Sequence, residues 1–159
     1  RREVVLMELR TSSAVIAFAQ KCETESAQFY EDAASRFSAL APTFRGFEKE
    51  NAKNVQDIKR AYYSVISDAL ETGFSFKNLA SESYEVETDL SPGAEPSQIL
   101  RTAIENETRL EQFYLQAAKT SQALMADLSR VFKRLCAGRE KRKSVLRQHL
   151  ERVCGPQGS

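Results

Sequence analysis

Two short stretches of the sequence match each other and contain the residues with the clearest chemical potential. One reads ETESAQFYEDAA and begins at Glu23; the other reads ETRLEQFYLQAA and begins at Glu107, 84 positions later. In each stretch the glutamate precedes a tyrosine by seven residues, and these tyrosines are Tyr30 and Tyr114. On a helix, this spacing places both side chains on one face about two turns apart. A carboxylate on an otherwise apolar helix face is a candidate metal ligand or a candidate partner for a buried cation.

Two pairs of polar residues interrupt the apolar stripes of the other periodic stretches. Asn51 and Asn54 form the first pair, and Arg139 and Arg142 form the second. Residues three apart project from one side of a helix within one turn. A carboxylate on one helix followed by such a pair on the next, repeated twice, is the layout of a carboxylate-bridged dinuclear metal site in a four-helix bundle.

With these features, residues 12–153 resemble the rubrerythrin branch of the ferritin-like family. The resemblance rests on the twice-repeated signature Glu-(five residues)-Phe-Tyr-(two residues)-Ala and on two hydrophobic pairs that precede the polar pairs, Phe44 with Phe47 and Phe132 with Leu135. It implies a di-iron or mixed-metal centre, activity as a peroxide reductase or ferroxidase, and a homodimer. It also implies that Glu23 and Glu107 occupy the positions of two carboxylate metal ligands.

The sequence departs from this family where the ligand set would be completed. Asn51 and Asn54 stand where the resemblance implies a bridging Glu and a His, and Arg139 and Arg142 stand at the equivalent positions of the second half. The sole histidine, His149, lies seven residues beyond Arg142, or about 10 Å along a helix, so it cannot replace a ligand at that level. Two arginines would balance two glutamates without metal, because a guanidinium group stays charged.

We therefore predict a degenerate site layer in which the arginines replace the metal ions as counter-charges to Glu23 and Glu107. Tyr30 and Tyr114 belong to this layer as core residues whose hydroxyl groups are hydrogen-bonded. The favoured function is that of a non-catalytic structural or interaction protein, without a catalytic residue and without a cofactor.

Two other functions stay open at this point. An iron or manganese site could retain Glu23 and Glu107 within a rearranged ligand set and act as a peroxide reductase or ferroxidase. A shift of one residue in helix register would support it by turning Glu50 or Glu140 inward. The other open function is a small-molecule binder that uses space in the bundle core.

Hydrophobic periodicity predicts the four helices that position these residues. The first is capped by Ser12 or Ser13, the second covers about 44–70, the third opens at Pro96 with Ser97 as its N-cap, and the fourth covers about 126–153. The connection 71–96 is long enough to cross the whole bundle, so the helices on either side of it can run parallel. The predicted fold is therefore all-α, a ferritin-like antiparallel four-helix bundle with a long crossover between helices two and three.

The bundle is predicted to consist of two helix-pair repeats. Aligned at an offset of 84, residues 13–40 and 97–124 share 11 of 28 identities, which indicates duplication. The predicted organisation is a lead-in segment 1–11, a bundle 12–154 made of repeat one 12–70, crossover 71–96 and repeat two 97–154, and a tail 155–159.

Composition limits the choice of partners and compartment. With 23 basic and 22 acidic residues the net charge is +1, so no global field attracts nucleic acid or an anionic membrane. No apolar run approaches the roughly 20 residues that span a bilayer. The 3 cysteines form no C-x-x-C pair, which argues against a disulfide framework or a zinc ribbon and favours the cytoplasm.

Overall fold

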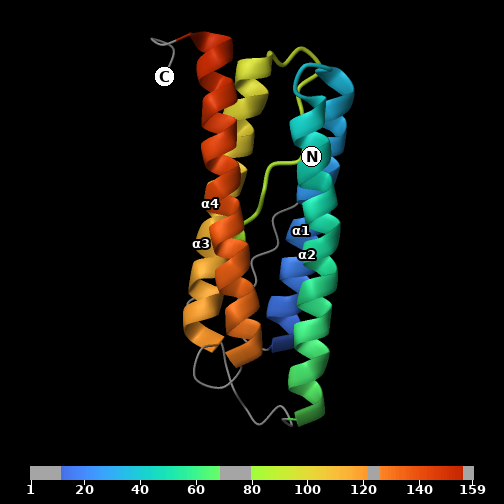
Figure 1. Cartoon of the computed structure of the whole chain (residues 1–159), viewed down its shortest axis with the longest axis vertical. Helices are drawn as coiled ribbons and strands as arrows, with labels where there is room; N and C mark the ends of the chain where they lie inside the picture. The colour runs from blue at the N-terminus through green and yellow to red at the C-terminus, as the bar shows by residue number, and fades with distance from the viewer. Residues whose placement is uncertain (1–11, 69–79, 122–125, 156–159) are drawn as a thin grey trace.

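A computed structural model describes residues 12–68, 80–121 and 126–155. These residues form four long α-helices and a short 3-10 helix: α1 (Ser12–Arg36), α2 (Ala41–Asp68), η1 (Ser81–Ser83), α3 (Pro96–Ser121) and α4 (Ala126–Cys154) (Figure 1). The predicted all-helical class is confirmed for this part of the chain. The predicted lead-in, residues 71–79 of the predicted crossover and residues 156–159 of the tail lie outside it. Within the described ranges, no helix has both the length and the apolar character needed to cross a membrane.

Two predicted helix starts differ from the structure. The second helix begins at Ala41 rather than near Phe44, because a proline (Pro42) is tolerated in the first turn of a helix, where no partner exists for its missing N–H. The third begins at Pro96, so the prediction of Ser97 as its N-cap is wrong. The side chain of Gln98 instead accepts a hydrogen bond from the backbone N–H of Glu95 at 2.7 Å, as in a capping box.

The helices pack as two hairpins, α1 with α2 and α3 with α4, and α2 also contacts α4. In Figure 1, α1 and α4 run toward the end of the bundle that carries the C-terminus, and α2 and α3 run away from it. Helices α2 and α3 are therefore parallel. The chain between them must return along the length of the bundle.

The described part of this return, residues 80–95, is fixed to both α1 and α3. Arg36 of α1 donates to the backbone oxygens of Leu90 and Ser91, at 3.1 and 2.6 Å. Asn106 of α3 exchanges two hydrogen bonds with the backbone of Glu87, at 2.8 and 2.9 Å. Tyr84 and Val86 are buried in the core. Residues 80–95 are therefore a packed connection, because pairing a segment's polar backbone groups allows its apolar side chains to be buried.

A layer of polar side chains divides the hydrophobic core into two clusters. One cluster contains Val15 and Cys22 of α1 with Leu110 of α3, and the other contains Phe29 of α1 with Ala103 of α3. Between these clusters lie buried polar residues from all four helices: Glu23, Ser26, Asn51, Glu107, Arg139 and Arg142. We call these six residues the polar layer. Its level in the bundle follows from the positions at which the apolar stripes are interrupted.

Candidate functional site

The polar layer is built around two fully buried glutamates, each bonded to the tyrosine of the other matching stretch. The hydroxyl of Tyr30 on α1 donates to Glu107 Oε2 at 2.5 Å, and that of Tyr114 on α3 donates to Glu23 Oε2 at 2.5 Å. Helices α1 and α3 run in opposite directions. The tyrosine that lies two turns beyond the glutamate of one helix is therefore level with the glutamate of the other helix. The seven-residue spacing therefore produces a reciprocal pair of hydrogen bonds between α1 and α3, in which both tyrosine hydroxyls are satisfied as predicted.

Arg139 of α4 lies at the centre of the layer and joins both glutamates. It is only 1% exposed, and its guanidinium group donates from Nη1 to Glu107 Oε1 at 2.9 Å and from Nη2 to Glu23 Oε2. Nη1 also donates to Ser26 Oγ at 3.2 Å and Nη2 to Asn51 Oδ1 at 3.2 Å. A buried charge is tolerated when it is paired and hydrogen-bonded in this way.

Two asparagines of α2 add further hydrogen bonds to the residues of α1 and α4 in this layer. Asn54, which is partly buried, donates to Glu23 Oε1 at 3.1 Å. Asn51 donates to Ser26 Oγ at 3.3 Å while accepting from Arg139. The contribution of Ser26 was not assigned from sequence. Its hydroxyl matters because one oxygen accepts from both the arginine and the amide.

Arg142 occupies the same layer but makes different contacts. Its Nε donates to Glu50 Oε1 at 3.1 Å and its Nη2 donates to the backbone oxygen of Phe47 at 3.0 Å. Its Nη1 lies 3.5 Å from Glu107 Oε2, at ion-pair distance but without a hydrogen bond. The guanidinium carbon also lies 4.8 Å from the ring centre of Phe47 and 5.8 Å from that of Tyr30, within the range of cation–π attraction.

The two arginines determine the ionisation of the layer. Burial opposes the charge of Glu107, but Arg139 and Arg142 outweigh it and hold the pKa of this carboxyl below its ordinary value. Burial likewise opposes the charge of Arg139, but Glu107 and Glu23 raise its pKa well above the ordinary value. The layer is therefore an ionic network, with a permanently charged guanidinium group at its centre.

Burial is the larger cause, and the adjacent carboxylate the next, of a pKa well above the usual value for both Tyr30 and Tyr114. The carboxylate is that of Glu107 for Tyr30 and that of Glu23 for Tyr114. Both phenols therefore stay neutral and donate hydrogen bonds throughout the physiological pH range.

The dinuclear metal centre implied by the resemblance does not fit these residues. Every carboxylate oxygen of Glu23 and Glu107 already accepts a hydrogen bond from a tyrosine, from Asn54 or from Arg139. The side chains that complete this set are amides and a guanidinium, which lack the anionic or imidazole character of typical ligands. Across the described ranges, no three His, Cys, Asp or Glu side chains are grouped so as to hold a metal ion.

The other residues considered from sequence lie outside the layer. Glu50 and Glu140 are exposed, so the shift in register that would turn either of them inward is wrong. His149 lies 3.0 Å from the hydroxyl of Thr43 through its Nε2. Cys22 packs in the core, where burial and then the charge of Glu23 raise its thiol pKa well above the ordinary value and disfavour a reactive thiolate.

Comparison of the chain with models of protein families, with curated proteins and with solved structures finds no match in any of the three.

The lowered pKa of Glu107 gives a prediction for stability in acid. A group whose pKa is lower in the folded state adds stability above its unfolded pKa, about 4.3 for Glu, and this stability is lost as the pH falls toward the folded value. We expect the ionisation of Glu107 to add no pH dependence to the free energy of unfolding, measured with urea, between pH 6 and 8. Below about pH 4.5 the free energy of unfolding should fall. In the Glu107→Gln variant this acid-dependent part should shrink, and an unchanged pH profile would contradict the assignment.

Proposed function

We propose that this protein is a diverged member of the ferritin-like group, related to rubrerythrins, in which a salt-bridge network has replaced a dinuclear metal site. Its role is structural or interactive rather than redox catalysis. The observation that carries the proposal is the guanidinium group of Arg139, which binds the carboxylates of Glu23 and Glu107 at once in the buried centre of the bundle.

The arrangement of the helices supports the ferritin-like part of this proposal. Two helix hairpins with parallel second and third helices correspond to the bundle topology with one long crossover. The reciprocal bonds between Tyr30 and Glu107 and between Tyr114 and Glu23 relate equivalent positions of the two halves, as expected after a duplication.

The distribution of charge supports an interaction role. Apart from the buried Arg139 and Arg142, helix α4 carries seven basic and three acidic residues, whereas residues 80–95 carry five acidic residues and no basic one. A protein with almost no net charge but with such segregated surfaces presents complementary potentials to partners. We include a homodimer in the proposal, to be tested by light scattering coupled to size-exclusion chromatography. A cytoplasmic location is also part of the proposal, supported by three free cysteines.

Metal analysis tests the proposed loss of the site directly. The full chain is produced with added iron and manganese, purified without chelators and analysed by mass spectrometry of its metals. We expect metal far below stoichiometry, equal in the wild type and in a Glu23→Ala/Glu107→Ala variant. Near-stoichiometric metal that disappears in this variant would instead support the alternative, an iron- or manganese-dependent peroxide reductase or ferroxidase.

A further inference from the structure

A small hollow between α2 and α4 opens over the arginine side of the polar layer. It has a volume of about 290 Å³ and is lined by Arg139, Arg142 and Gly138 of α4 and by Glu50 and Asn54 of α2, among others. An added Cβ at Gly138 would meet no atom within 4 Å. A glycine in a helix interior is unfavourable, and here it leaves the hollow open toward the buried guanidinium groups.

The lining of this hollow is strongly basic. It contains five cationic side chains and one carboxylate: Lys53, Arg134, Arg139, Lys141 and Arg142, with Glu50. Three of these cations are already paired: Arg139 with the buried glutamates behind it, Arg134 with Asp57 and Arg142 with Glu50. Lys53 and Lys141 are exposed at the rim, and neither forms an ion pair within the described residues. A concave surface with excess positive charge concentrates anions.

Arg142 is the buried group that points to a ligand. Its side chain is 3% exposed, and its Nη1, which has no hydrogen-bond partner among the described residues, lies 3.5 Å from Oε2 of the buried Glu107. Its Nε is held by Glu50, whose side chain is 61% exposed and therefore free to exchange with a competing anion. An anion that replaces Glu50 on Nε would keep this donor of the buried guanidinium hydrogen-bonded, and a buried donor without a partner is costly.

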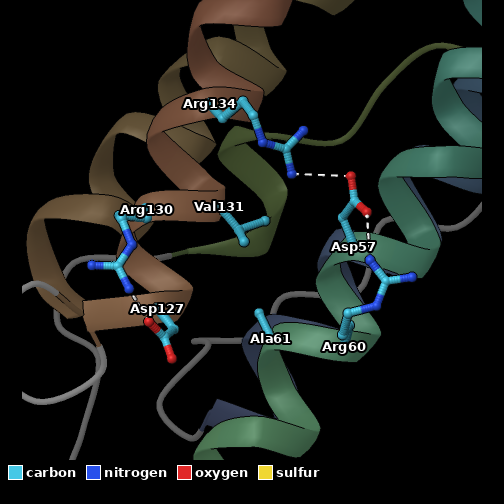
Figure 2. Close-up of a pocket in the computed structure, with 7 residues that line it drawn as sticks. All are labelled: Asp57, Arg60, Ala61, Asp127, Arg130, Val131 and Arg134. Atoms are coloured by element: carbon cyan, nitrogen blue, oxygen red, sulfur yellow. Dashed lines mark hydrogen bonds and ion pairs between the residues drawn. The ribbon is translucent and has the colours of Figure 1, made fainter.

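A larger hollow of about 580 Å³ adjoins this one along the same helix pair, but each of its arginines is already paired with an aspartate. Figure 2 shows Arg60 and Arg134 turned toward Asp57 from α2 and α4, and Arg130 turned toward Asp127. Asp57 accepts from these two arginines at 3.3 and 3.0 Å. The internal pairing makes this hollow the weaker anion site of the two.

We propose that the smaller hollow binds an oxyanion group, the phosphate or carboxylate of a small ligand, which displaces Glu50 from Arg142 and is flanked by Lys53 and Lys141. One oxygen of such a group takes the place of Glu50 Oε1 as the acceptor of a charge-assisted hydrogen bond from Nε of Arg142. The volume lies at the lower limit of small-molecule pockets, so the ligand is small. This site goes beyond the proposed structural role and does not depend on the outcome of the metal analysis.

Calorimetric titration of the full chain with inorganic phosphate and, separately, with malonate at constant ionic strength tests the proposal. Glu50→Gln removes the competing carboxylate and is expected to tighten binding about three- to tenfold. Lys53→Gln with Lys141→Gln is expected to weaken it by a similar factor, using exposed side chains only. Glu140→Gln is the matched control, since it removes one negative charge from α4 outside the hollow. The affinity of this variant for the anion should stay within about twofold of the wild-type value.

Two further variants separate the site from general electrostatic attraction. Gly138→Leu fills the hollow from a position with open space for a Cβ, and should abolish binding while the circular dichroism spectrum is retained. Arg142→Gln should also abolish binding. Because Arg142 packs on Phe47, its fold is verified in the same way, and the lysine variant tests the proposal if this one unfolds.

The outcomes are distinct. Binding of phosphate but not malonate assigns a phosphate-bearing ligand, the reverse assigns a carboxylate, and binding of both supports the shared oxyanion chemistry. The proposal is overturned if neither probe binds the wild type or Glu50→Gln at millimolar concentration. Equal gains in affinity for Glu50→Gln and Glu140→Gln would also overturn it, as would unimpaired binding to Gly138→Leu.

Discussion

Replacing Arg139 with methionine is expected to lower the free energy of unfolding by about 3–5 kcal/mol at pH 7, the largest effect of any single polar substitution in the bundle. The variant leaves Glu23 and Glu107 buried without their shared counter-charge. Their remaining hydrogen bonds, from Tyr114, Tyr30 and Asn54, do not supply a full positive charge. Glu107 keeps an ion pair with Arg142 at 3.5 Å, whereas Glu23 keeps none among the described residues. Urea denaturation followed by circular dichroism measures the loss.

Two controls show whether the stranded charges cause this loss. Adding Glu23→Gln and Glu107→Gln to Arg139→Met removes the uncompensated charges, and most of the lost stability should return. Arg134→Met removes an arginine of the same helix that is 50% exposed and paired with Asp57, and it should cost less than about 1 kcal/mol. A similar cost for both single variants would mean that Arg139 acts mainly through packing.

Replacing Tyr30 or Tyr114 with phenylalanine is expected to lower the free energy of unfolding by about 1.5–3 kcal/mol each, the range for hydrogen bonds to charged groups. Each change removes one hydroxyl that donates to a fully buried carboxylate at 2.5 Å, and keeps the ring in place. The two variants should lose similar amounts, because the bonds relate equivalent positions of the two halves. Tyr63→Phe is the control, since Tyr63 is 66% exposed and should lose almost nothing.

Alkaline titration gives an independent measurement of these two tyrosines. Burial and the neighbouring carboxylates raise their pKa in the folded state, so they contribute stability below about pH 10 that is lost as the pH rises further. Tyrosinate absorbance should show that both groups ionise together with unfolding. Ionisation of Tyr30 and Tyr114 near pH 10 in the folded protein would contradict the buried hydrogen bonds.

The residues of the site could largely be selected from sequence, but their partners could not. Glu23, Glu107, Arg139 and Arg142 stand out because a charged residue in an apolar stripe of helical period must lie in the core or interrupt it. The spacing of Arg139 and Arg142 suggested equivalent roles. Residues three apart nevertheless differ by about 60° in direction around a helix, and the structure aims the first at two glutamates and the second at Glu50 and a backbone oxygen.

The sequence by itself determined the four helices, the position of the polar layer along them and the matching halves, because hydrophobic period, helix breakers and repeats are local properties of the chain. Only the tertiary structure decided which charges meet. The pairing of Tyr30 with Glu107 and of Tyr114 with Glu23 requires α1 and α3 to run in opposite directions at one level. The shared arginine requires α4 to reach both carboxylates. These pairings depend on how helices far apart in the chain pack together. The spacing of the residues within each helix does not specify the pairings.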